Sequence, residues 1–466
     1  MALVLAGLVL AMLLGALDQT IMAPALPAVA GDLGGLDQMP GVVTAYLVAA
    51  TVVMPVYGKL GDRYGRKRTL QVAVVVFVAG AVLCGLAASM PQLIAFRAVQ
   101  GLGGGGLVIG AQAAIGELVS PRERGRYLGY FGAAYVVAAV GGPLLGGFLI
   151  DRLSWRWIFA IYPPLGLLTL VLLAAALRLP RPEATRRPLD VAGALALAAT
   201  VVGVVLAGQT HRPTFLLLAA GGLVAWLVSA RYAADPILPL RLFRERAFAV
   251  PVGISLAIGF ALFGTITYMP AYLQIAMRAS ATGAGLLVTA LMGGALLATV
   301  VSGRLITRTG RYKPFPVAGT AVATAGLALV GLTAASPPAL AAAMLLTGWG
   351  LGMTMQVMVL AAQNAVSYGD LGTATSSVTF VRQIGASAGV AVVGALITLR
   401  SGIPATATPA ELPDGVREAF AAAVPPVFGA MAPLLAVAFL LSLALPARPL
   451  RTTAHVDEAA VEQQLP

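Results

Sequence analysis

The sequence predicts an all-α membrane protein that crosses the bilayer many times. Hydrophobic residues make up 59% of the 466 residues and charged residues only 10%, whereas a soluble domain carries roughly 25% charge. Apolar runs about as long as a membrane-spanning helix recur along the whole chain. The cations gather in the short segments between these runs, as in loops beside a membrane.

Fourteen apolar runs are long enough to cross the hydrocarbon as helices, which need about 20 residues each. An even number of spans places both ends of the chain on the same side of the membrane. We expect the spans at residues 3–29, 41–58, 69–88, 92–115, 128–150, 156–177, 190–208, 214–231, 248–273, 283–302, 315–334, 338–361, 374–399 and 424–445.

The basic residues indicate which side is cytoplasmic. If the segment 59–68 is cytoplasmic, the cytoplasmic segments hold 22 of the Lys and Arg residues and the opposite segments hold 6. Cytoplasmic loops carry the excess of Lys and Arg. The richness in Ala, Gly and Arg is typical of a GC-rich bacterial genome. We therefore expect a bacterial cytoplasmic (inner) membrane protein with both termini in the cytoplasm.

The composition argues against several other kinds of protein. The net charge of +12 is spread over the loops, so we expect no nucleic-acid partner. Cys84 is the only cysteine, and His211 and His455 lie outside the predicted spans. We therefore expect no disulfide, no metal site and no histidine proton relay. The apolar N-terminus lacks a basic start, so we expect it to remain as a helix.

The stretch GKLGDRYGRKR at residues 58–68 stands between two apolar runs. It contains five cations, one carboxylate and three glycines. No lipid-facing helix tolerates that density of charge, so we expect a tight polar loop at the membrane surface. The stretch resembles motif A of the major facilitator superfamily, the loop that joins helices 2 and 3 of those transporters. The motif is filled by Gly58, Asp62, Arg63, Gly65, Arg66 and Lys67.

Other segments resemble one branch of that superfamily, the fourteen-helix drug:proton antiporters of the EmrB/QacA type. Residues 17–27 (LDQTIMAPALP) resemble its helix-1 signature, and Arg97 in RAVQGLGGGG resembles motif B. Residues 121–126 and 380–391 also match. Motif C, whose resemblance implies antiport rather than symport, is filled by Gly141, Gly142, Pro143, Gly146 and Gly147. Within it we expect a close-packed, kinked hinge between helices.

The resemblance implies the major facilitator fold, with two six-helix bundles and two extra central helices. A partial repeat supports two bundles: residues 302–313 repeat the loop at 58–68, with Thr307 in place of the acidic residue. We expect an N-terminal bundle at 1–177, a basic cytoplasmic linker at 178–189, two extra helices at 190–231, a second cytoplasmic linker at 232–247, a C-terminal bundle at 248–445 and a cytoplasmic tail at 446–466.

Asp18 is the candidate for proton coupling. Of the eighteen carboxylates, it alone lies well inside a predicted span. Burial disfavours the ionised form of a carboxyl group, so such a residue can hold a proton near neutral pH and release it when its surroundings change. The alternative is a structural aspartate that hydrogen-bonds to neighbouring helices.

Two arginines also fall inside predicted spans. An intramembrane cation costs at least about 2.5–3.5 kcal/mol at a helix centre unless it is paired or hydrated. We expect Arg97 to face the central cavity and to act on Asp18 or another polar partner, unless it extends to the membrane surface. The same reasoning applies to Arg382, which lies nearer the cytoplasmic end of its predicted span.

The charges of motif A are interpreted as a gate. We expect Asp62, Arg63 and Arg66 to hold the cytoplasmic side shut, with Glu117 placed to pair with Arg66. An exposed ion pair contributes about 0–1 kcal/mol, which still biases two states that differ by a few kcal/mol. Membrane topology alone would explain the cations but not Asp62 or the glycines.

We expect a substrate cavity between the bundles, because Met and aromatic surfaces accept many shapes. No well-buried carboxylate is predicted in the C-terminal half, which favours neutral, monocationic or lipophilic cargo. The GxGxxG match at 101–106 follows no strand, so it indicates close helix packing rather than a nucleotide site. The candidate lining residues are Gln19, Tyr46, Arg97, Gln100, Gln112, Tyr135, Phe260, Phe263, Tyr268, Met355, Gln356, Met358 and Arg382.

Taken together, these features predict a monomeric secondary transporter, not an enzyme, that exports hydrophobic or cationic drugs in exchange for protons and so supports antibiotic resistance. The proton-motive force replaces any cofactor, and no ATP-binding P-loop is present. One alternative is an exporter of the same fold with one dedicated cargo, such as a lipid, a sugar or a host-made antibiotic. A membrane-embedded enzyme would need a His, Cys or paired-carboxylate site, and a channel would need polar rings around a pore.

Overall fold

The computed structural model describes residues 2–35, 38–179, 188–210, 212, 214–279, 281–333, 336–402 and 414–450. These residues form helices and no strand. Most of the linker expected at 178–189, both histidines and the tail from residue 451 lie outside the described residues.

Fourteen segments of the described chain are long and apolar enough to cross a membrane, which confirms the predicted number. The N-terminal half contributes α1 (Ala2–Ile21), α3 (Met39–Tyr64), α4 (Arg66–Gly85), α5 (Met90–Leu118), α6 (Pro121–Arg152) and α8 (Tyr162–Ala176), with the short elements η1 (Ala23–Ala25), α2 (Leu26–Leu33) and α7 (Trp157–Ala160). The additional helices are α9 (Val191–Thr210) and α10 (Thr214–Tyr232), followed by the short α11 (Leu240–Arg244). The C-terminal half contributes α12 (Arg246–Ala276), α13 (Ala281–Thr309), α14 (Pro314–Thr333), α15 (Pro337–Asn364), η3 (Tyr368–Asp370), α16 (Leu371–Ser401), α17 (Asp414–Gly429) and α18 (Ala432–Leu443).

The predicted polar loop at 58–68 is wrong. Helix α3 continues through Tyr64 and α4 begins at Arg66, so Gly65 alone separates the two helices. Gly65 has φ +93°, a conformation that glycine adopts at little cost. The charged stretch is therefore helical on both sides of one sharp corner, which fixes the directions of its side chains.

The first span is shorter than the predicted 3–29, because α1 ends at Ile21. Pro24 and Pro27 follow closely, and proline supplies no backbone N–H to continue a helix. The remaining residues form η1 and the separate helix α2.

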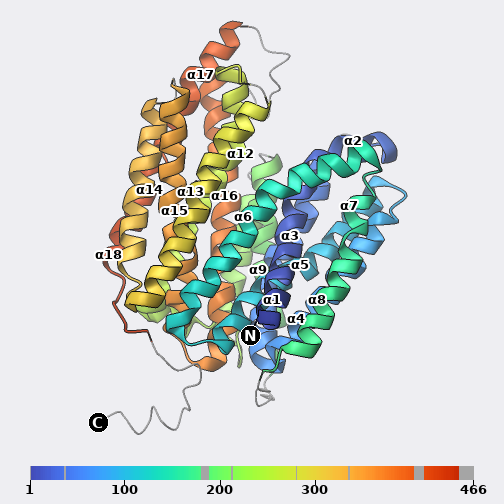
Figure 1. Ribbon diagram of the computed structural model, residues 1–466, viewed down its shortest axis with the longest axis vertical. Helices are drawn as coiled ribbons and strands as arrows, with labels where there is room; N and C mark the ends of the chain where they lie inside the picture. The colour runs from blue at the N-terminus through green and yellow to red at the C-terminus, as the bar shows by residue number, and fades with distance from the viewer. Residues whose placement is uncertain are drawn as a thin grey trace.

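The helices pack into two bundles, one from each half of the chain. In the N-terminal half α5 packs against α3 and α4, and α1 packs against α6; in the C-terminal half α12 packs against α16, and α15 against α13 and α14. The halves meet along two seams, α3 against α16 and α6 against α13. In Figure 1 the halves converge at the lower end and diverge towards the upper end. We call the lower end, where α3 turns into α4, the closed end.

Glycines bring the two halves into backbone contact at the closed end. A Cβ atom at Gly58 of α3 would lie 2.6 Å from the carbonyl oxygen of Gly372 in α16. A Cβ atom at Gly303 of α13 would overlap the carbonyl oxygen of Gly125 in α6. A larger side chain at either position requires a helix to move, so both seams depend on glycine.

The two additional helices cover one of these seams. Helix α9 packs on both α3 and α16, and α10 packs on α9. One hydrophobic cluster joins Met54 of α3, Trp226 of α10 and Phe380 of α16. The α9–α10 hairpin therefore contacts both halves of the molecule.

The segment that connects α10 to α12, residues 233–245, crosses the same seam, and we call it the strap. Asp235 of the strap forms an ion pair with Lys59, near the end of α3. Arg241, in α11, forms an ion pair with Asp370, just before α16, with a nitrogen–oxygen distance of 2.7 Å. Glu245, the last residue of the strap, also pairs with Arg448, which follows α18. The strap therefore forms one ion pair with the N-terminal half and two with the C-terminal half.

Candidate functional site

Asp18 lies inside the N-terminal bundle in contact with Arg97. The side chain of Asp18, on α1, is 0% exposed and that of Arg97, on α5, is 1% exposed. Nη1 of Arg97 donates to both carboxylate oxygens of Asp18, at 2.9 Å to Oδ1 and 2.7 Å to Oδ2. The two charged residues singled out inside the N-terminal spans are thus direct partners.

Two further candidates complete this cluster. Gln100 accepts a hydrogen bond from Arg97 at 2.9 Å and donates one to Asp18 at 3.0 Å. The guanidinium of Arg97 also lies 4.4 Å from the ring centroid of Tyr46, whose hydroxyl donates to the carbonyl oxygen of Gly15 at 3.3 Å. The buried charges are therefore paired and hydrogen-bonded, as a low-dielectric interior requires.

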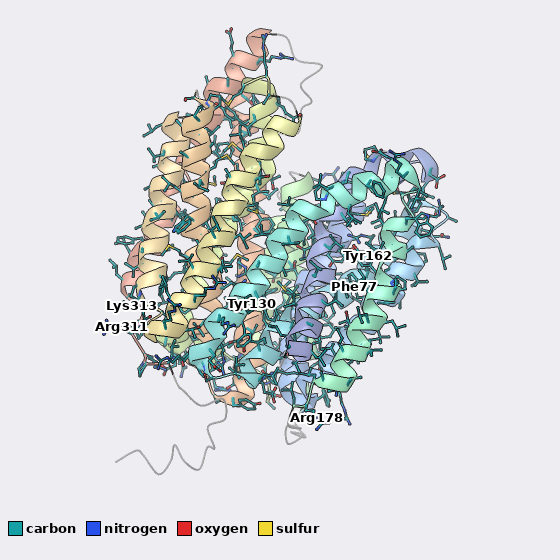
Figure 2. The ribbon with its side chains drawn as sticks, in the orientation of Figure 1. Phe77, Tyr130, Tyr162, Arg178, Arg311 and Lys313 are labelled. Atoms are coloured by element: carbon teal, nitrogen blue, oxygen red, sulfur yellow. The ribbon has the colours of Figure 1, made fainter. Side chains whose placement is uncertain are left out.

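Tyr162, on α8, is a neighbour of Asp18 that the sequence analysis missed. Its ring packs edge-on against Phe77 of α4, with the ring centroids 5.1 Å apart (Figure 2). The side chain is fully buried and close enough to Asp18 to interact with it electrostatically. Its sequence context, YPP at the start of α8, carries no signal of a polar site.

The charge of Asp18 decides whether Arg97 has a counterion. As a carboxylate, Asp18 neutralises Arg97; a protonated Asp18 would leave a buried guanidinium without its counterion, a loss of several kcal/mol. Because both side chains are sealed from solvent, a proton reaches Asp18 only when α1 and α5 move or water enters.

At the closed end, Arg66 joins two carboxylates. Its Nη2 lies 2.9 Å from Oδ1 of Asp62, and its Nη1 lies 2.9 Å from Oε2 of Glu117. None of the three side chains is more than 6% exposed. Arg63 behaves differently: it stacks on the ring of Tyr64 and forms no ion pair with any described residue.

Asp62 also reaches across the α3–α16 seam. Its carboxylate accepts hydrogen bonds from the backbone N–H groups of Gly372 and Thr373, both at 2.7 Å, and from the Thr373 hydroxyl at 2.9 Å. The first N–H groups of a helix have no partner within it and carry the positive end of its dipole. A carboxylate of the N-terminal half thus caps a helix of the C-terminal half and joins the two.

The C-terminal copy of this corner makes a different contact. Thr307 stands in the place of Asp62, and its hydroxyl donates to the carbonyl oxygen of Gly303 in its own helix at 3.0 Å. The α6–α13 seam is bridged instead by Arg122, an exposed residue at the start of α6. It donates to the carbonyl oxygens of Thr307 and Arg308 at 3.2 and 3.1 Å. These carbonyls belong to the last turn of α13, the negative end of its dipole.

Two glycines of motif C hold α6 against the helix that carries Asp18. A Cβ atom at Gly142 would overlap the hydroxyl of Thr20, and one at Gly146 would lie 2.6 Å from the carbonyl oxygen of Ile21. Helix α6 continues without interruption through the proline of the motif. The other motif residues are half-buried or exposed: Gly141, Pro143 and Gly147.

The cavity candidates are not gathered into one site. Tyr46, Arg97 and Gln100 point into the Asp18 cluster within the N-terminal bundle. Tyr135 and Gln356 line a cavity of about 30 Å³ between α6, α12, α13 and α15. Met355 lines the same cavity; elsewhere, Gln19, Phe260, Phe263 and Tyr268 are half-buried, and Gln112 and Met358 are buried.

Arg382 lies eleven residues after the start of α16 at Leu371, about 16 Å along the helix axis. The residue is 8% exposed, and its Nη1 has no hydrogen-bond partner among the described residues. Both amide atoms of Gln356 and the hydroxyl of Thr379 are also buried without a described partner. Arg382 therefore has no ion-pair partner among the described residues, unlike Arg97.

Comparisons with known proteins agree with these features. A family model for the Major Facilitator Superfamily matches residues 8–390 and 252–464. An uncharacterized MFS-type transporter of Mycobacterium tuberculosis is 41% identical over 488 residues, covering 97% of this chain and 70% of the relative. The multidrug transporter protein MdtP of Bacillus subtilis is 34% identical over 414 residues, covering 86% of this chain and 76% of the relative. These matches confirm the resemblance carried by motifs A, B and C.

The solved structures that match are of the same fold. The crystal structure of the human organic anion transporter MFSD10 gives a TM-score of 0.69 and covers 95% of this chain and 99% of that one. Its sequence is 16% identical to this chain, so the likeness supports the fold alone.

Proposed function

Because the chain belongs to the Major Facilitator Superfamily, we propose that it is an antiporter that exports hydrophobic compounds in exchange for protons. The similarity to a multidrug transporter supports export of small molecules. The excess of Lys and Arg supports a cytoplasmic position for the closed end and both termini. The protein would act as a monomer in the bacterial inner membrane, driven by the proton-motive force.

Proton coupling rests on the sealed Asp18–Arg97 pair. Asp18 is the carboxylate buried at the core of a membrane helix, and its neutralisation would release Arg97. The effect has a physical path to the other half, because α1 packs on α6 through Gly142 and Gly146, and α6 packs on α13. A change at Asp18 would therefore alter the α6–α13 seam.

In the proposed cycle, the described conformation is open away from the cytoplasm. The contacts of Asp62 with α16 and of Arg66 with Glu117 hold the cytoplasmic end shut. A proton that enters from outside neutralises Asp18, and the resulting movement of α1 and α6 weakens the α6–α13 seam. Cargo then enters from the cytoplasm, the proton leaves on that side, and the closed end forms again.

The test measures proton movement that depends on cargo. The protein would be reconstituted in liposomes that contain a pH-sensitive dye, and ethidium (a cation), Nile red (neutral) and pyrenebutyrate (an anion) would be added one at a time. We expect proton flux with at least one compound in the wild type, and flux at background in Asp18→Asn. The matched control is Asp151→Asn, an exposed carboxylate at the far end of α6, which should keep full flux.

Two outcomes would contradict parts of this proposal. Flux retained in Asp18→Asn would move the proton site elsewhere, with Glu117 the next candidate. Wild-type flux with none of the three compounds would contradict export of diverse drugs and favour an exporter with one dedicated cargo.

A further inference from the structure

Arg382 is a buried cation that forms no ion pair with any described residue. Its Nη1 is buried without a partner in the described part of the chain. Arg97, the intramembrane arginine of the other half, is neutralised by Asp18. A buried charge is normally paired or bound to a ligand, so the unpaired guanidinium of Arg382 indicates that a ligand binds there.

The carboxylates of the described spans do not pair with Arg382. Within the six spans of the C-terminal half, acidic residues occur only at the ends, as Asp370 and Glu418. Asp370 is bound to Arg241 and stands about 18 Å along the helix axis from Arg382, beyond the reach of an arginine side chain. Asp18 is already held by Arg97 and Gln100. Among the described residues, Arg382 therefore has no carboxylate partner.

One polar group near Arg382 comes from the other half of the protein. Tyr135, on α6 of the N-terminal half, is close enough to Arg382 to interact with it electrostatically. Tyr135 also lines the cavity of about 30 Å³ shared with Gln356, whose amide has no described partner. A cavity of this size holds about one water molecule, so a larger ligand occupies the site only after the halves move apart.

We propose that the cargo is a hydrophobic acid whose anionic group binds Arg382, with Tyr135 and Gln356 as further hydrogen-bond donors. The planar guanidinium fits a carboxylate with two parallel hydrogen bonds, and hydrogen bonds to charged groups are the strong ones. Because Tyr135 and Arg382 belong to different halves, the acid would contact both and bias their relative position. This inference rests on the proposed export function, and it replaces the neutral or monocationic cargo that the sequence favoured.

The test compares three probes that share one hydrophobic group and differ in charge: pyrenebutyrate, pyrenebutanol and pyrenebutyl-trimethylammonium. Binding to the purified full chain would be followed by energy transfer from tryptophan to pyrene. Specific binding is the part of this signal that is lost when an excess of a pyrene-free analogue of the same charge is added. We expect the wild type to bind the anion at least about tenfold more tightly than the alcohol. In Arg382→Gln this ratio should fall to about one, and in Arg382→Lys it should be reduced, because an ammonium offers no planar fork.

Arg400→Gln is the matched control, since Arg400 is an exposed cation at the far end of the same helix, and its ratio should equal that of the wild type. The ratio is measured within each variant, so a partly unfolded sample does not imitate the result. A wild type that binds the three probes equally, or that prefers the ammonium, overturns the proposal without any variant. An anion preference that persists in both Arg382 variants also overturns it.

This experiment needs no proton gradient, so its outcome is separate from that of the export test. Failure of proton coupling would leave the binding preference for the acid intact. Loss of the acid preference would leave proton-coupled export of neutral compounds intact.

Discussion

On the α3–α16 seam, a buried carboxylate, Asp62, caps the first turn of a helix in the other half. On the α6–α13 seam, an exposed cation, Arg122, caps the last turn of a helix in the other half. The backbones match at the two places, because Gly58 and Gly303 both touch the opposite helix. The two seams thus share close helix packing but differ in their polar contact. At the α3–α16 seam the contact is made by a buried carboxylate on the helix of the repeated corner, and at the α6–α13 seam it is made by an exposed cation on the opposite helix.

The difference between the two contacts indicates which seam contributes more to the stability of the closed end. The Asp62 contact is sealed from solvent and reinforced by Arg66 and Glu117, and the strap covers the same seam. Solvent screens the Arg122 contact, and exposed polar contacts contribute little. We therefore expect the α3–α16 seam to hold the closed state and the α6–α13 seam to respond to Asp18.

The largest effect is expected from Asp62→Ala. The change removes three hydrogen bonds across the seam and leaves Arg66 with one carboxylate, and breaking a buried ion pair costs about 3–5 kcal/mol. The measurement is the distance between spin labels on Arg68→Cys and Arg311→Cys, exposed at the closed end, in a Cys84→Ala background. We expect the long-distance population to rise more than about a hundredfold relative to the short one. An unchanged distance distribution would show that Asp62 does not hold the seam.

Intermediate effects are expected when either glycine contact is filled. Gly58→Leu and Gly303→Leu each place a side chain where the opposite backbone lies, and overpacking costs about 1–3 kcal/mol. With the same labels, both variants should favour the long distance. Gly221→Leu is the control, since nothing lies within 4 Å of that position. If only Gly58→Leu increased the distance between the labels, the α6–α13 seam would not contribute to holding the closed end shut.

The smallest effect is expected from Arg122→Ala. It removes two exposed hydrogen bonds to the end of α13, so the ratio of long to short distances should change only about two- to fivefold. Arg126→Ala is the matched control, because Arg126 bonds to Tyr130 of its own helix. A response to Arg122→Ala as large as that to Asp62→Ala would make the seams equal and remove the asymmetry.

The sequence predicted the number of spans and a contact of Arg97 with Asp18 or another polar partner for a simple reason. Asp18 and Arg97 each interrupt an apolar run, and two opposite charges inside one bundle have few other partners. The pairing of Arg66 with Glu117 was also expected, because both residues stand at the same end of neighbouring spans.

The contacts between the two halves were not predicted, because no local sequence pattern indicates which distant residues meet. Asp62 and Thr373 are separated by 311 positions in the chain, and Arg241 and Asp370 by 129. The first turns of α16, from Thr373 to Thr379, are polar, and the predicted span began within them, at residue 374. They are buried between helices, where neighbouring carbonyl groups satisfy most of their hydroxyls.

The strap limits how far the ends of α3 and α16 can separate. Asp235 is tied to α3 and Arg241 to α16, and the chain between them spans at most about 20 Å when fully extended. Pro236 and Pro239 lie in that short segment and restrict its conformations further. As long as both ion pairs hold, the ends of α3 and α16 can separate only as far as this tether allows.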